Sequence, residues 1–202
     1  MPRRPTRTVP TVLLHGPIGH GHGDWQPWLA DQLRTAGREV RFPELPNPQR
    51  PDLAEWSSVL RDTLAGLPDD GFDVIAHSLS CLLWLHHATN HSGEAKVSRP
   101  ARVALVAPPA ARPGADLAAG WSSFYPVPLD IDAIRGAADG TVLVGSDDDP
   151  YCPGGVAQAY GAPLKMAATV VSGAGSLTAE TGFGPWPAVL DWCGRDNLAF
   201  IA

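Results

Sequence analysis

The chain has 202 residues and a formal net charge of −6, from 15 Lys and Arg against 21 Asp and Glu. This modest acidic balance argues against nucleic-acid binding, and the length suits one domain with a substantial core. No apolar run approaches membrane-spanning length, and the three cysteines, at 81, 152 and 193, are widely spaced. We therefore expect a cytoplasmic protein with reduced thiols and no membrane association.

Short apolar runs alternate with amphipathic helical patterns along most of the chain. Strands are predicted at residues 11–14, 39–43, 72–75, 102–106, 141–144 and 167–171. Helices are predicted at residues 25–36, 52–64, 79–91, 131–136, 156–160 and 187–192. This alternation predicts a mostly parallel sheet covered on both faces, a three-layer α/β/α sandwich. We expect one domain over residues 1–202, with a loose arm at 1–10 and a lid segment at 107–128.

The most informative stretch is VIAHSLSC, residues 74–81, in which an apolar strand runs into a turn of small residues. An amphipathic helical pattern follows, so the predicted order is strand, sharp turn, helix. The turn is close to G-x-S-x-G, with Ala76 and Ser80 at the glycine positions, and it places Ser78 at the tip as a candidate nucleophile. The alternative is a serine that caps the helix and carries no chemistry.

Three further loops follow predicted strands. They are HGPIGHGHGD at 15–24, SDDDP at 146–150, and the glycine-rich segment at 173–184. Ligands of open parallel sheets bind beyond the carboxyl ends of the strands. Topology alone therefore predicts that these loops meet Ser78 at one edge of the sheet.

With its loops in this order, the chain resembles the α/β-hydrolase superfamily, and more narrowly the small serine hydrolases of the retinoblastoma-binding-protein-9 and YdeN type. The motifs that carry the resemblance are LLHG with a Gly-rich loop and DWQPW, AHSLSC, SDDDPYC, and GAGSLTAETGFGPWP. The resemblance covers nearly the whole chain. It implies a Rossmann-like α/β-hydrolase fold and hydrolysis of small esters or amides by a Ser–Asp–His triad.

The resemblance places the nucleophile on Ser78 and the acid on Asp149, which precedes a proline. The family's histidine falls on Ser176, and no histidine follows His91. The implied triad is therefore degenerate: Ser78, Asp149 and Ser176.

In the family that the chain resembles, two backbone N–H groups form the oxyanion hole. One belongs to the residue after the nucleophile, here Leu79, and the other to the loop after an early strand. The natural second donor here is position 17, but Pro17 has no N–H. Gly16 or Ile18 would have to replace it. Removing a triad histidine costs roughly 10⁶ in kcat in subtilisin, and losing one oxyanion donor costs roughly 10²–10³. We expect a small-molecule enzyme of serine-hydrolase descent, acting on an ester-like or acyl-bearing substrate, whose hydrolysis is impaired or rerouted.

Four explanations of the missing base stay open. In the first, a histidine on the loop expected to overhang Ser78 acts as a substitute base: His15, His20 or His22. The second is a lyase (elimination or dehydration) or cyclase that uses the same pocket. The third is a silent ligand-binding pseudoenzyme, and the fourth is that Ser176 is an introduced substitution.

The irregular segment at 107–128 supplies candidate substrate-binding aromatics, Trp121, Phe124 and Tyr125. His77 is predicted to pack on the face of the turn opposite to Ser78, and Asp147 and Asp148 to face solvent or to bind loop backbone. The sequence has no phosphate-cradling glycine loop and no metal-ligand spacing, so we expect no cofactor and no metal. The only partner expected is a small-molecule substrate, and the oligomeric state is not predicted.

Overall fold

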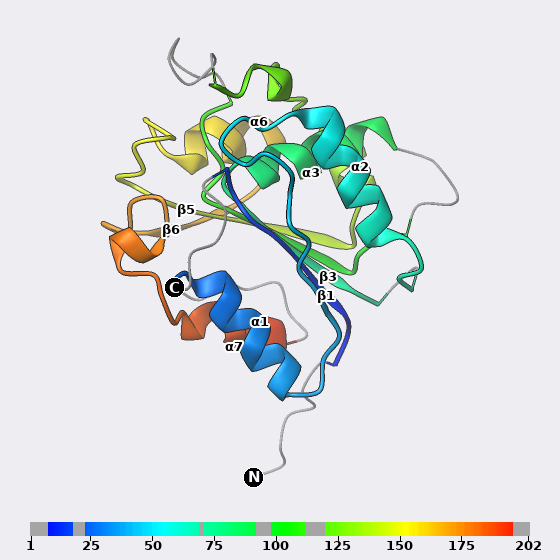
Figure 1. Ribbon diagram of the computed structural model, residues 1–202. Helices are drawn as coiled ribbons and strands as arrows, with labels where there is room; N and C mark the ends of the chain where they lie inside the picture. The colour runs from blue at the N-terminus through cyan, green and yellow to red at the C-terminus, as the bar shows by residue number, and fades with distance from the viewer. Residues whose placement is uncertain (1–7, 18–22, 69–70, 92–97, 112–119, 196–202) are drawn as a thin grey trace.

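The computed structural model describes residues 8–17, 23–68, 71–91, 98–111 and 120–195. Six strands form one parallel sheet in the order β2-β1-β3-β4-β5-β6 (Figure 1). The strands are β1 (Thr11–Leu14), β2 (Val40–Arg41), β3 (Asp73–His77), β4 (Arg102–Val106), β5 (Gly140–Ser146) and β6 (Ala168–Val171). The parallel sheet confirms the predicted α/β architecture.

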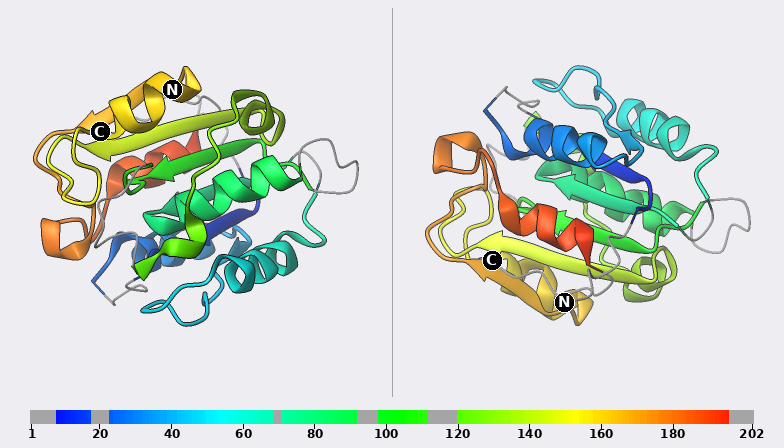
Figure 2. Two further views of the ribbon diagram at one scale, coloured as in Figure 1. Left: turned by 90° about the horizontal axis from the view of Figure 1, so that it is seen from above. Right: turned by 90° about the horizontal axis from the view of Figure 1, so that it is seen from below.

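Helices cover both faces of the sheet, as the views from above and below show (Figure 2). One face carries α1 (Trp25–Thr35) and α7 (Pro187–Gly194), which pack in one apolar cluster. The other face carries α2 (Leu53–Leu64), α3 (Leu79–Asn90), α5 (Ile131–Gly136) and α6 (Ala162–Leu164). None of the helices in the described ranges is long and apolar enough to cross a bilayer.

Alternation along the central strands divides the core between the two faces. In β4, Val103 and Leu105 join the cluster under α2 and α3, whereas Ala104 and Val106 join the cluster under α1 and α7. All four side chains are fully buried. A strand that is buried on both faces has a continuous run of apolar residues in the sequence. The bounds of β4 were predicted without error for this reason.

Besides shifts of one or two residues at the ends of β3, β5 and β6 and of several helices, two elements differ from the sequence prediction. The strand predicted at 39–43 pairs only over β2, because it lies at the sheet edge and bonds to β1 alone. The α-helix predicted at 156–160 is a π-helical turn, Ala157–Gly161, that leads into α6. Pro163 has no N–H to donate to Ala159, which a regular α-helix through this segment would need.

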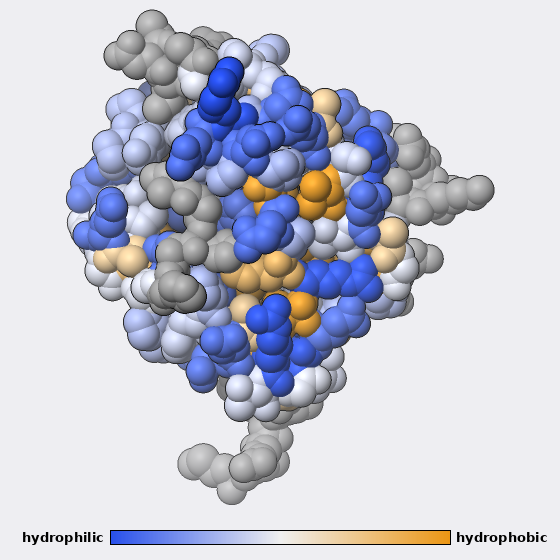
Figure 3. Space-filling model, viewed as in Figure 1, coloured by the Kyte–Doolittle hydropathy of each residue, from blue (hydrophilic) through white to orange (hydrophobic). Residues whose placement is uncertain are grey.

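The surface over the edge formed by β1 and β2 is mostly hydrophilic, with hydrophobic side chains gathered between α1 and α2 (Figure 3). Val40 and Phe42 are only partly buried here, although they pack against the core. A two-residue edge strand offers a short template for pairing with another chain.

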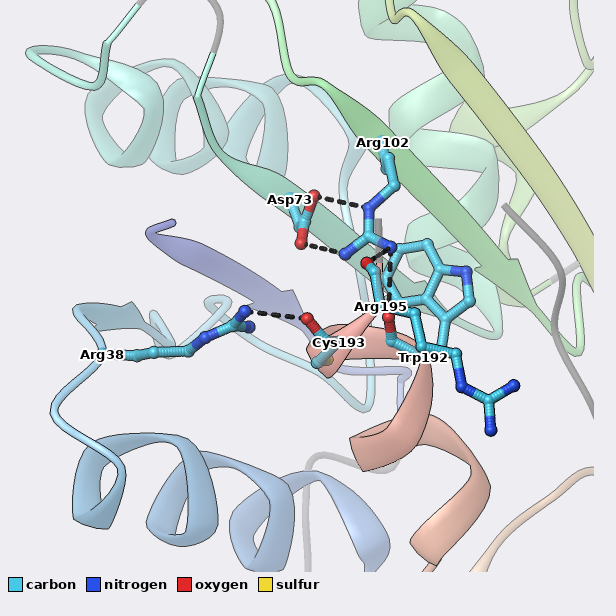
Figure 4. A network of polar contacts seen from close by, with 6 residues as sticks. All are labelled: Arg38, Asp73, Arg102, Trp192, Cys193 and Arg195. Carbon is cyan, nitrogen blue, oxygen red and sulfur yellow. Dashed lines mark hydrogen bonds and ion pairs between the residues drawn. The ribbon is translucent and has the colours of Figure 1, made fainter. Parts of the chain in front are cut away.

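A buried ion pair lies at the opposite end of the sheet from the loops that follow the strands (Figure 4). Asp73 and Arg102 face each other at the starts of β3 and β4, and Arg102 donates to both carboxylate oxygens at 3.0 and 2.5 Å. Its Nη1 donates to the carbonyls of Trp192 and Arg195 at 3.1 and 2.7 Å, and its guanidinium lies 4.1 Å from the Trp192 ring centroid. One side chain thus fastens the carboxyl end of α7 to the sheet.

Candidate active site

Ser78 occupies a strained turn between β3 and α3. Its backbone has φ 56° and ψ −125°, a conformation that a residue with a Cβ atom adopts only at a cost. The turn is held by tertiary contacts: Ser78 N donates to the Val106 carbonyl at 2.8 Å. A Cβ atom at Gly16 would lie 2.9 Å from Ser78 Cβ, so the loop after β1 packs directly on the serine. This is the strand, sharp turn and helix that the sequence predicts, with a partly exposed serine at its tip.

Asp149 lies in the loop after β5 and is only 5% exposed. One of its oxygens accepts the Tyr151 N–H at 2.9 Å. Burial raises the pKa of this carboxyl to about 6; the bond from Tyr151 opposes the rise, and the neighbouring charge of Asp148 adds to it. The site thus holds a carboxylate that is costly to ionise.

The loop that carries Ser176 is fastened to the loop that carries Asp149. The backbone N–H groups of residues 173, 174 and 175 donate to Asp147, Ser146 Oγ and Asp148 at 2.8, 2.9 and 2.7 Å. The bond from residue 173 lowers the pKa of Asp147, and the Ser146 hydroxyl does the same for Asp148. Both predicted roles of this acidic pair are found: Asp147 and Asp148 are exposed, and each also binds loop backbone, here that of the loop that carries Ser176.

On its other side, the Ser176 loop is fastened to His77 and to α1. His77 Nε2 lies 2.9 Å from the Ser176 carbonyl, which can only accept, so this nitrogen carries the proton. Burial lowers the pKa of His77, which favours the neutral ring. Trp25 packs edge-on against that ring and donates its indole N–H to the Leu177 carbonyl at 2.9 Å. His77 is buried and packs against Trp25, while its predicted orientation opposite to Ser78 stays a prediction. Its contact with the Ser176 loop was missed, and nothing in its spacing signals it.

These contacts connect the three predicted triad positions through their neighbours in the chain. Residue 175 bonds to the residue before Asp149, and residue 176 bonds to the residue before Ser78. Within the described residues, however, no hydrogen bond joins the side chains of Ser78, Asp149 and Ser176 to one another. The side chain of serine is shorter than that of histidine. The Ser176 hydroxyl therefore lies closer to its own backbone than the far ring nitrogen of a histidine would, and it does not reach the other two side chains.

His15 does not fit the role of substitute base. It is fully buried, its Nδ1 lies 2.8 Å from the Gly16 carbonyl, and its Nε2 accepts the Leu45 N–H at 2.9 Å. The ring packs edge-on against Trp56 and Phe42. Since both nitrogens bind backbone, neither is available to take a proton from Ser78, and we correct that expectation. The alternatives His20 and His22 lie outside the described residues.

Residues 11–194, which are almost the whole chain, match the model of the family described as serine hydrolase. The chain belongs to the serine hydrolase family. Residues of this chain are 30% identical over 83 positions to YdeN of Bacillus subtilis, a match that spans 40% of this chain and 43% of YdeN.

Solved structures support the fold of this serine hydrolase. The Bacillus subtilis ydeN product has a TM-score of 0.74 at 23% identity, covering 91% of this chain and 96% of its own. A YdeN-like protein from Pectobacterium atrosepticum has a TM-score of 0.70 at 21% identity, covering 92% and 89%. Together with the parallel sheet, these similarities confirm the α/β-hydrolase fold. Likeness to the retinoblastoma-binding-protein-9 type stays a prediction.

The predicted aromatic wall of the serine hydrolase needs one correction. Phe124 is fully buried and packs edge-on against Trp56, with ring centroids 5.4 Å apart, so it is a core residue. Trp121 and Tyr125 are partly exposed. The Trp121 ring lies 5.9 Å from the ring of Tyr151, which the sequence analysis did not single out although it follows Asp149 by two positions.

The oxyanion donors stay predictions. Leu79 is the first residue of α3, where backbone N–H groups have no partner within the helix. Pro17 follows Gly16, which packs on Ser78, and it supplies no N–H. Ile18 lies outside the described residues.

Proposed function

We propose that this serine hydrolase acts on a small ester-like or acyl-bearing molecule through Ser78, with Asp149 and Ser176 at the other triad positions. Its hydrolytic power is impaired or rerouted, because Ser176 stands where a general base is needed. The observation that carries this proposal is the pair of contacts on either side of residue 176. Gly175 bonds to Asp148 and Ser176 bonds to His77, so residue 176 lies between the neighbours of the nucleophile and the acid.

The chemistry follows from the side chains at these positions. Without a base, Ser78 is a neutral alcohol and a poor nucleophile at pH 7. The hydroxyl of Ser176 cannot take its proton, and a triad carboxylate such as Asp149 ordinarily orients an imidazole and does not itself remove the proton. Deprotonation of Ser78 should therefore limit the rate of acyl transfer.

The test is covalent labelling by a fluorophosphonate probe, which reacts with activated serines. We expect Ser176→His to be labelled at least about 100-fold faster than the unmodified protein, a conservative share of what a triad histidine contributes. Ser78→Ala in the Ser176→His background should abolish the signal. Ser58→His, which makes the same change on the exposed face of α2, is the matched control and should behave like the unmodified protein.

Two results would contradict the proposal. Equally fast labelling of the unmodified protein and Ser176→His would show that a base from elsewhere already activates Ser78. Labelling of neither protein would favour the ligand-binding pseudoenzyme, since Pro17 withholds one oxyanion donor.

A further inference from the structure

Asp149 is a buried carboxylate whose hydrogen bonding is incomplete. It is 5% exposed, and within the described residues its hydrogen bond is the one from the Tyr151 N–H, at 2.9 Å to one oxygen. Two side chains that interact with it electrostatically are the Asp148 carboxylate and the buried Cys152 thiol, neither of which carries positive charge. Burying a carboxylate is costly unless an N–H donor or a cation pairs with it.

The reacting serine lacks the complementary group. Ser78 Oγ needs a proton acceptor, and no hydrogen bond within the described residues joins it to Asp149 or Ser176. The site therefore presents a hydroxyl that needs an acceptor and a carboxylate that needs a donor. Between their neighbours lies Ser176, whose short side chain bonds to neither.

One chemical group meets both needs, because an imidazole has an N–H on one side of its ring and an unprotonated nitrogen on the other. Tyr151, whose backbone N–H binds Asp149, has its ring 5.9 Å from the ring of Trp121, and both residues are partly exposed. Aromatic rings near the acid suit a flat, basic heterocycle that becomes cationic during the reaction.

We infer that the substrate of this protein brings its own base: an ester or other acyl compound whose acyl part carries an imidazole or a similar basic heterocycle. One ring nitrogen accepts the proton of Ser78, and the N–H of the other donates to Asp149. This inference rests on the proposed function and names the substrate class for the same site.

The reaction balances with water as the only co-reactant. As Ser78 Oγ bonds to the acyl carbon, the ring nitrogen of the substrate takes the hydroxyl proton and the ring becomes a cation beside Asp149. Collapse of the tetrahedral intermediate breaks the bond to the leaving alcohol, which receives that proton. Water then attacks the acyl-Ser78 ester, loses a proton to the same nitrogen, and releases the acid as the proton returns to Ser78.

The experiment compares methyl 3-(imidazol-4-yl)propanoate with methyl 3-phenylpropanoate, which differ in the ring alone, at pH 7.5. The unmodified protein should hydrolyse the imidazolyl ester with at least about ten-fold higher kcat/KM, the lower end of what one general acid–base contact provides. Asp149→Asn should lose the preference. Ser176→His should also lose it, because the protein then supplies the ring. Asp62→Asn, which removes a carboxylate from the exposed side of α2, should keep the preference.

A binding measurement separates this inference from the proposed function. Imidazole itself, titrated calorimetrically, should bind the unmodified protein at least about ten-fold more tightly than Asp149→Asn. If Ser78 proves unreactive but imidazole binds in this Asp149-dependent way, the proposed hydrolysis fails and the ligand class stands. Equal binding of imidazole to the two proteins overturns the inference, and so does measurable hydrolysis of both esters at equal rates.

Discussion

Replacing Arg102 by methionine should lower the free energy of unfolding by about 3–5 kcal/mol, the usual cost of breaking a buried ion pair from one side. Asp73 is fully buried and Arg102 is 3% exposed, so solvent cannot replace the guanidinium that faces the carboxylate. The change also removes the donor to the carbonyls of Trp192 and Arg195, and the cation over the Trp192 ring. Methionine keeps much of the aliphatic volume, so the loss is mainly electrostatic.

This is a large share of the roughly 5–15 kcal/mol that stabilises a typical domain. At about 2–4 °C per kcal/mol for a chain of this size, Tm should fall by roughly 6–20 °C. Urea unfolding, monitored by circular dichroism, measures the free energy of unfolding, and scanning calorimetry measures Tm. The double variant Asp73→Leu, Arg102→Met should recover at least about half of the loss, since well-packed apolar residues often replace a buried pair without cost.

Arg34→Met provides the control. Arg34 pairs with Asp31 at 3.8 Å on the exposed side of α1, and an exposed pair of this kind contributes about 0–1 kcal/mol. A loss of less than about 1 kcal/mol in Arg102→Met would refute the reasoning. So would a slower reaction of the fluorophosphonate with folded Arg102→Met, Ser176→His than with Ser176→His alone, because the ion pair lies at the far end of the sheet from Ser78.

Two further predictions concern the site. Gly175 has φ +52°, and a Cβ atom there would lie 2.5 Å from Thr181 Cγ2. Gly175→Ala should therefore lower the free energy of unfolding in urea by about 2–5 kcal/mol, and a loss below about 1 kcal/mol would contradict this. The pKa of Asp149, about 6, lies above its ordinary 3.8, so folding favours the protonated form, and this contribution to stability is lost as pH rises through 6. Asp149→Asn should therefore be roughly 1–3 kcal/mol more stable than the unmodified protein at pH 7, with the difference shrinking toward pH 4; lower stability at pH 7 would argue against it.

The sequence by itself determined the architecture. Buried strands of a parallel sheet are continuous apolar runs, and the helices that cover them are amphipathic. Both patterns can be recognised in a short stretch of sequence. The strand bounds at β1 and β4, and those of α5, were predicted without error. The turn at Ser78 was legible for the same reason, since it depends on a short local order of strand, small residues and helix.

Tertiary structure alone decided what individual polar and aromatic side chains do. His15 looked like a loop histidine near the nucleophile, but the N–H that occupies its ring belongs to Leu45, thirty positions away. Phe124 looked like a pocket aromatic, yet its ring packs on Trp56 from α2. Neither partner is visible in local spacing.

The three consecutive aspartates show the physical reason most clearly. Their side chains are chemically identical and adjacent, so the sequence offers nothing to distinguish them except the proline after Asp149. In the folded protein Asp147 and Asp148 accept N–H groups of the loop after β6, while Asp149 is buried. Burial and hydrogen-bond partners set the pKa and the role of a carboxylate, and for Asp147 and Asp148 the backbone partners come from a segment more than twenty residues away.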